Sequence, residues 1–220
     1  MATTFKPFGL KPVYHPSGLD RAVPFVGTNT FVTGTTFTAP YSLSAGESFF
    51  QYQPVSLTAS GQLTIANQTA ASGTVYGVFD GVEFTTAEGR RTVGKSASKT
   101  TLDAATQILF WIFADPALVY EAQVNGSATT ASIGRQYNFD TTAGSTVTSG
   151  TTIGTGGAGF STTALLATPV ATTVQGQVRV VGLGREVSYP AGELNAWGDT
   201  YTIVQVQIAN NTFVAPKVSI

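Results

Sequence analysis

The chain has 220 residues, of which 42% are hydrophobic and 11% aromatic, enough to build a substantial buried core. Only 10% of the residues are charged, and 11 basic against 12 acidic residues leave a formal net charge of -1. A nearly neutral chain lacks the electrostatic attraction that drives nucleic-acid binding, so we expect no nucleic-acid partner. The absence of cysteine excludes disulfide scaffolds, zinc fingers, iron–sulfur sites and cysteine catalysis.

Short β-strands are predicted along most of the chain. About one residue in six is threonine, which is stiff at χ1 and suits a pleated surface, and 24 glycines supply turns. Apolar alternation predicts strands at residues 22–26, 30–33, 49–58, 62–66, 75–79, 82–86, 108–114, 119–124, 174–183 and 200–208. Helix is predicted only as one or two turns at 101–107 and 161–166. The expected fold class is therefore all-β, a barrel or a sandwich.

Several strands carry finer signals. Pro54 predicts that 49–58 is a bent or edge strand. The dipeptide at 125–126, Asn-Gly, favours a hairpin turn after strand 119–124. Phase slips in the apolar alternation within 174–183 and 200–208 predict β-bulges or strands that change sheets.

The segment 108–114, ILFWIFA, is apolar on both faces and is too short to span a bilayer as a helix, so no membrane partner is expected. Such a run is typical of a central strand or of one buried by a partner. We therefore expect Trp111 to be buried in the core or under a neighbouring subunit, with Phe110 and Phe113 also serving subunit or core packing.

Four stretches organise the chain. We expect an extended N-terminal arm at 1–20, the first half of a β domain at 21–125, and strands completing that domain at 164–220. Between them, 126–163 is dominated by Thr, Ser, Gly and Ala and has too few apolar residues to fold alone. It is expected to be a projecting loop or hairpin, or an arm ordered by a neighbouring chain.

The N-terminal arm combines proline with aromatic residues. Three prolines and a glycine between residues 5 and 16 disfavour helix and central strand. An extended, proline-stiffened segment loses little entropy when it orders on another surface. The arm is thus expected either to contact a partner or to cover an open end of its own barrel. The residues expected to make such contacts are Phe5, Pro7, Phe8, Gly9, Leu10, Pro12 and Tyr14.

Two motifs resemble nucleotide-binding loops but lack the required context. Residues 89–96 match G-x-x-x-x-G-K-[ST], with an apolar strand and Asp115 downstream, yet no apolar stripe follows that would pack a helix on a sheet. A surface turn between two strands is the favoured interpretation. Residues 154–159 match G-x-G-x-x-G inside the Gly-rich stretch, where a flexible loop is favoured. The single histidine, His15, lies in the arm, away from any recognisable triad. We expect no catalytic, cofactor or metal site.

Islands of sequence resemble a family of tailed-bacteriophage head proteins, the capsid cement or decoration proteins. The opening PFGLKPV at 7–13 is similar to the PFGLRPV start of that family, with lysine in place of arginine at position 11. Shorter islands follow in the same order, at 53–55, 77–79, 115–124, 133–134, 181–183 and 204–206. The segment after Phe139 is longer than is usual in the family.

The resemblance implies a structural virion protein rather than an enzyme. Such a protein binds the outer surface of the shell formed by the major capsid protein and stabilises it. It implies a location on the capsid exterior, in the host cytoplasm before assembly, and a homo-oligomer for which a trimer is favoured. The alternative is a glycan- or receptor-binding β module, for which Trp197 near Asn195 and Asp199 is the candidate cluster. A P-loop nucleotide-binding protein is the remote alternative.

Overall fold

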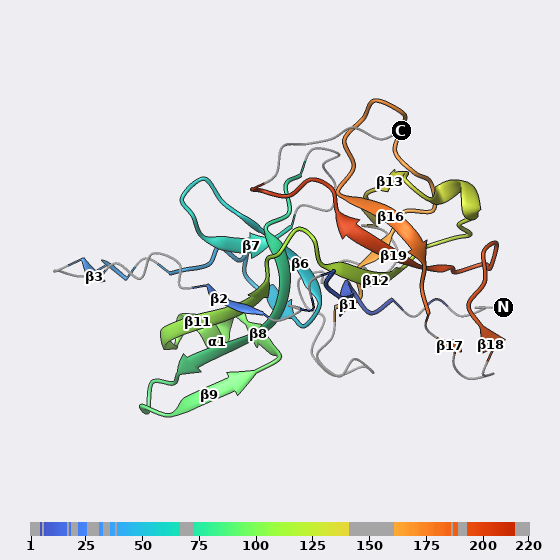
Figure 1. Ribbon diagram of the computed structural model, residues 1–220. Coiled ribbons are helices and arrows are strands. Elements are labelled where there is room, and N and C mark those ends of the chain that lie inside the picture. The colour runs from blue at the N-terminus through green and yellow to red at the C-terminus, as the bar shows by residue number, and fades with distance from the viewer. Residues whose placement is uncertain are drawn as a thin grey trace.

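The computed structural model describes residues 5, 7–16, 18, 22–25, 31–32, 36–37, 39–66, 73–140, 161–185, 187–188 and 193–213. These residues form antiparallel sheets with very little helix, which confirms the all-β prediction (Figure 1). The architecture is that of a sandwich. The G-x-G-x-x-G match and most of the predicted Gly-rich projection lie outside the described residues.

The strands of the first half are β1 (Lys11–Tyr14), β2 (Val23–Phe25), β3 (Phe31–Val32), β4 (Thr36–Phe37), β5 (Ser48–Phe50), β6 (Gln53–Leu57), β7 (Leu63–Ile65), β8 (Gly77–Thr85), β9 (Arg91–Gly94), β10 (Ser96–Ser98), β11 (Thr106–Phe113) and β12 (Val119–Gln123). Those of the second half are β13 (Gln136–Tyr137), β14 (Phe139–Asp140), β15 (Ala164–Leu165), β16 (Val178–Leu183), β17 (Val187–Ser188), β18 (Glu193–Leu194) and β19 (Ile203–Ile208). The helical elements are α1 (Lys99–Asp103) and a 3-10 turn (Thr130–Ser132).

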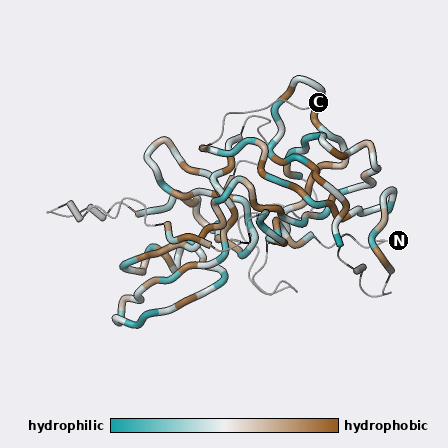
Figure 2. Tube along the Cα trace, viewed as in Figure 1, coloured by the Kyte–Doolittle hydropathy of each residue, from teal (hydrophilic) through white to brown (hydrophobic). Residues whose placement is uncertain are grey.

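Two sheets dominate the fold. One has five strands in the order β1-β12-β19-β16-β13, and the other has the order β2-β11-β8-β6-β7 with β9 also paired to β8. In Figure 1 the first lies at the upper right and the second at the lower left. Strand β11 is central, between β2 and β8, as its apolar run predicts, and most of it is brown in Figure 2.

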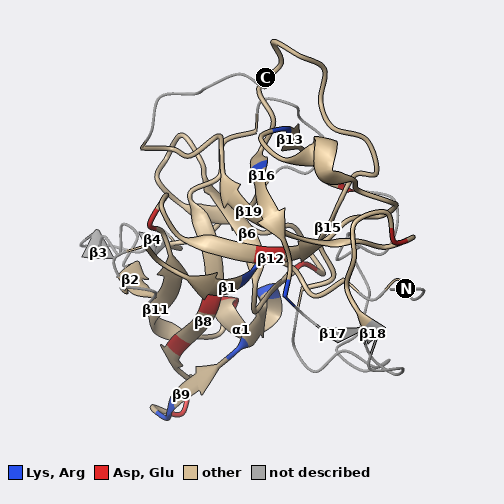
Figure 3. Cartoon of the chain, turned by 45° about the vertical axis from the view of Figure 1, so that its right-hand side comes forward, with Lys and Arg blue, Asp and Glu red and all other residues tan. Residues whose placement is uncertain are grey.

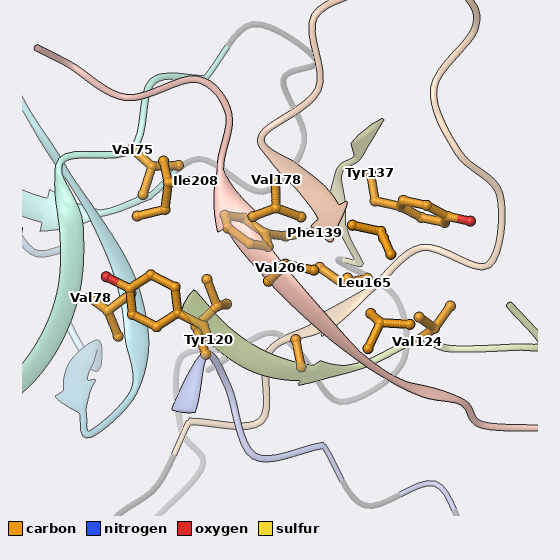
Figure 4. Packing of buried hydrophobic residues seen from close by; sticks show 14 of the residues in the cluster. Val75, Val78, Tyr120, Val124, Tyr137, Phe139, Leu165, Val178, Val206 and Ile208 are labelled. Carbon is orange, nitrogen blue, oxygen red and sulfur yellow. The ribbon is translucent and has the colours of Figure 1, made fainter. Parts of the chain in front are cut away.

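The described residues form two hydrophobic cores, and the first, built on the five-stranded sheet, also takes in Val78 of β8 and Phe113 of β11 from the other sheet. The first core packs Tyr120, Val178 and Val206 of the five-stranded sheet against Phe139 and Leu165 (Figure 4). The second core packs inward-facing residues of the other sheet under α1 and β5, with three phenylalanine rings in mutual contact. Their centroids are 5.4 Å apart for Phe49–Phe79, 5.4 Å for Phe49–Phe110 and 6.2 Å for Phe79–Phe110. Aromatic pairs at such separations add stability beyond the area that they bury.

Several predicted boundaries change. The strands expected at 75–79 and 82–86 are one strand, β8, because Asp80 forms a bulge rather than a turn: Trp111 opposes Gly81, and the next residue, Ile112, opposes Phe79. The segment 49–58 is not one strand: it divides into β5, which pairs with β10, and β6, which is not an edge strand because β7 and β8 flank it. The slip within 174–183 is a bulge between Val180 and Gly182. The pairing of β19 with β12 is regular, so that strand contains no bulge there.

Helix and loop predictions change as well. The turn expected at 161–166 is instead β15, which pairs with β14. The dipeptide at 125–126 does not close a hairpin, because β12 pairs with β1 and β19 rather than with the next strand. Within the stretch predicted as a projection, Tyr137 and Phe139 are fully buried in the first core. These two aromatic residues bring the chain up to residue 140 into the body of the protein.

Candidate functional site

The N-terminal arm is attached to the body as an edge strand. Strand β1 pairs antiparallel with β12, and Lys11 opposes Glu121. Just before it, Leu10 is fully buried in the first core. The Leu10 backbone N–H donates to the carbonyl oxygen of Tyr52 at 2.8 Å. The arm is therefore anchored by both a buried side chain and backbone hydrogen bonds.

Gly9 is required where the arm crosses the body. Its φ of +79° is left-handed, and a Cβ at this position would lie 2.3 Å from the Tyr52 carbonyl oxygen and 2.8 Å from Cβ of Ser161. Tyr52 itself has a φ of +66°. The neighbouring Gln51 carbonyl accepts from the Ser161 N–H at 2.7 Å, so three segments distant in sequence meet here.

The other predicted contact residues of the arm are at least partly at the surface. Phe5 packs against the ring of Tyr201, with centroids 5.2 Å apart. Tyr14 is 45% exposed. The half-buried members are Pro7, Phe8 and Pro12. Gly9 and Leu10, in contrast, are buried in the chain's own interior.

His15 makes a contact that the sequence did not indicate. Its Nε2 lies 3.0 Å from Oδ2 of Asp115, at the start of the turn between β11 and β12. The other oxygen of Asp115 accepts from the Ala117 N–H at 2.8 Å. The pairing of β1 with β12 brings these residues together across 100 positions of sequence, so no local pattern predicted it. The contact fixes the end of the arm.

A layer of polar side chains lies on the face of the five-stranded sheet opposite the first core. Glu121 and Gln205 oppose each other in register and are both buried. The Arg185 backbone N–H donates to Oε1 of Glu121 at 2.8 Å. The alternation of VYEAQ in β12 indicates this division into an apolar and a polar face. Because Glu121 is used to hold the backbone at residue 185, we assign it a structural role.

The three aromatic residues predicted to pack in the central strand are placed differently. Phe110 is fully buried in the second core and Phe113 is 8% exposed in the first. Trp111 lies on the opposite face of β11, is only partly buried, and belongs to neither core. Within this chain alone, its ring remains partly open to solvent.

The P-loop match is a surface hairpin. Residues 86–90 form the turn between β8 and β9, with the Gly89 N–H donating to the Thr86 carbonyl at 2.9 Å. The Lys95 that would bind phosphate lies between β9 and β10, and no helix begins there. A phosphate-binding loop needs a helix N-terminus at that point.

The candidate glycan cluster serves the fold. Asn195 is buried; its Nδ2 donates to the carbonyls of Gly184 at 2.9 Å and Ile203 at 2.7 Å, and its Oδ1 accepts from the Ile203 N–H at 3.0 Å. Asp199 accepts from the Ala196 N–H at 2.9 Å. Trp197 packs partly against the first core. These amide and carboxylate groups bind the protein's own backbone, so Asn195 and Asp199 serve the fold.

The described residues contain no group of three or more His, Asp or Glu side chains placed to hold a metal ion. None of the helices in the described part of the chain has the length and apolar character needed to cross a bilayer. A pocket of about 330 Å³ beside the 3-10 turn is lined by hydroxyl-bearing residues and Arg135 together with the apolar Ala131, Ala167 and Pro169. Comparisons with protein families, with curated proteins and with solved structures found no match to this chain.

Proposed function

We propose that this protein is a structural component of a bacteriophage virion that binds the outer surface of the assembled capsid shell and stabilises it. Its partner is the major capsid protein, and it acts as a repeated subunit without catalysing a reaction. It is made in the host cytoplasm and then resides on the capsid exterior. The family resemblance of the arm and of the later islands supports this proposal.

The observation that carries the proposal is the anchoring of the arm. Gly9 and Leu10 hold it to the body, while Phe8 and Tyr14, on either side, remain at the surface. A segment fixed in this way loses little conformational entropy when it meets a second surface. Apolar side chains at fixed positions then bind by hydrophobic burial.

The weak charge of the chain also supports binding to a crowded protein lattice. Charged segments are sparse on the described part of the chain, as the few blue and red segments of Figure 3 show. Neighbouring copies therefore repel one another weakly. Many modest contacts repeated over a lattice add up to strong retention through avidity. A homo-oligomer would strengthen this effect, and a trimer is the state that the family resemblance favours.

The test is co-sedimentation of the purified full-length protein with shells assembled from the major capsid protein of the same particle. Phe8→Ser removes a half-buried aromatic ring from the arm. Phe213→Ser is the matched control, because Phe213 is 67% exposed at the other end of the chain. Losing one buried aromatic contact costs about 2 kcal/mol, roughly a 30-fold weaker affinity per contact.

We expect Phe8→Ser to lose shell binding by at least about tenfold and Phe213→Ser to keep it. If the unmodified protein does not sediment with shells, the proposed function is wrong. If Phe8→Ser binds as well as the control variant does, the arm is not the binding element.

A further inference from the structure

One face of the sheet that contains β11 is covered by the second core; the other is covered by the first core at Phe113 and Val78 but is only partly covered at Leu109 and Trp111. Phe110 and Ile112 point into the second core, so Leu109 and Trp111, which alternate with them, point the other way. The register places Pro24 and Gly81 beside Trp111. It also places Glu83 beside Leu109, and Val93 of β9 beside Glu83. We define the outward face as Pro24, Gly81, Glu83, Val93, Leu109 and Trp111.

Apolar side chains are exposed on the outward face. Val93 is 72% exposed and Pro24 is exposed, whereas Trp111 and Leu109 are partly so. Leu109 and Trp111 belong to neither core. Exposed apolar side chains scattered singly are normal on a protein surface, whereas neighbouring ones on one sheet face are candidates for an interface.

The outward face also contains a hollow beside the exposed valine. It has a volume of about 190 Å³ and is lined by Glu83, Phe84, Thr85, Arg91, Gln107 and Leu109. Gln107 has a left-handed φ of +53° within the irregular stretch of β11 between Thr106 and Leu109. A non-glycine residue in this conformation costs about 1–3 kcal/mol and persists only where the surrounding structure imposes it. Gln107, in this irregular stretch of β11, is thus one of the residues that line the hollow.

The charge on this part of the sheet is balanced. Glu83 and Arg91 form an ion pair in which the arginine side chain is 76% exposed and the glutamate side chain 13% exposed. Because the acid and the base pair within one copy, the face carries no excess charge of one sign that would repel the same face of a second copy. An isologous interface requires this compatibility, since the same patch must fit itself.

We propose that the outward face binds the same face of a second copy of this chain, about a two-fold axis. Val93 of each copy enters the hollow of the other, and the two Trp111 rings become buried. The outward face spans the four strands β2, β11, β8 and β9, which lie about 4.8 Å apart, and a few residues along each strand, with a rise of about 3.3 Å per residue. Its footprint is therefore roughly 20 by 20 Å. This is smaller than the about 800 Å² per partner of a standard interface, so the dimer forms only at raised concentration or on a lattice.

The test is sedimentation velocity of the full-length protein, without shells, at concentrations from roughly 1 to 500 µM. Val93→Glu places a charge in the centre of the contact, and Val93→Lys does so with the opposite sign. Leu194→Glu is the control, because Leu194 is 75% exposed on β18, away from the outward face. Circular dichroism establishes that each variant is folded.

We expect the unmodified protein and Leu194→Glu to convert from monomer to dimer as concentration rises. Both Val93 variants should dimerise at least about tenfold more weakly. If Val93→Glu does not fold, Val93→Lys decides. A protein that stays monomeric throughout, or assembles only as a trimer, contradicts the proposal, as does a Val93 variant with unchanged dimerisation. None of these results depends on shell binding, so this inference and the proposed function can fail separately.

Discussion

Replacing Gly9 by alanine tests whether the arm is held by its close approach to the body. Two costs arise at this position itself, and a third arises at the neighbouring Leu10. The left-handed φ of +79° costs an L-residue about 1–2 kcal/mol. The new Cβ would also lie 2.3 Å from the Tyr52 carbonyl oxygen, which is backbone and cannot rotate away.

Relief of that overlap requires the arm to move by about 1 Å, which is the scale at which overpacking costs about 1–3 kcal/mol. The same movement weakens the hydrogen bond from the Leu10 N–H to Tyr52, worth about 1 kcal/mol. We therefore expect Gly9→Ala to lower the free energy of unfolding by about 3–5 kcal/mol. In a chain of this length, that corresponds to a fall in Tm of roughly 6–20 °C.

Gly89→Ala is the matched control for this experiment. Gly89 has a φ of +80°, but no atom lies within 4 Å of the Cβ that alanine would add. It should lose only the conformational part, about 1–2 kcal/mol. Urea unfolding followed by far-ultraviolet circular dichroism measures both variants. Equal losses for the two would refute the reasoning, because the contact with Tyr52 would then contribute nothing.

Two further predictions concern buried polar groups. Asn195→Ala removes all three hydrogen bonds to Gly184 and Ile203. We expect this change to lower the free energy of unfolding, measured by urea denaturation, by about 2–4 kcal/mol. A loss below about 1 kcal/mol would contradict the structural role of Asn195. Burial raises the pKa of the Tyr120 hydroxyl above its usual value. Tyr120 therefore stabilises the fold fully at pH values below about 10, the pKa of tyrosine in the unfolded chain. This contribution is lost as the pH rises further, because the unfolded chain then releases the proton more readily than the folded one. Tyr120→Phe should therefore make stability fall less steeply with pH between about 10 and 12 in urea titrations; an unchanged pH dependence would contradict this.

The local pattern of the sequence predicted most strands because alternation records which residues share a face. The run ILFWIFA identified a central strand, and the alternation VYEAQ separated the core face of β12 from its polar face. Prediction from local pattern failed where a residue is compatible with two local structures. The Asp80-Gly81 pair is compatible with either a turn or a bulge, and the pairing with β11 across 30 positions selected the bulge.

The arm illustrates the same division. Its prolines predicted an extended segment with apolar side chains free to bind a surface. Which side chains are used internally depends on what lies beside the arm: Leu10 meets the first core, and Gly9 passes the backbone of Tyr52. The contact between His15 and Asp115 also required the pairing of β1 with β12, which no nearby residue encodes.

By itself, the sequence determined that this is an all-β protein with an extended arm, because strand propensity, alternation and proline restrictions act between near neighbours. Only the tertiary structure decided which face of each strand is covered. Phe110 and Trp111 are adjacent and similarly apolar, yet one is buried in a core and the other is only partly covered. Burial depends on the elements that pack against a strand, and those come from distant parts of the chain.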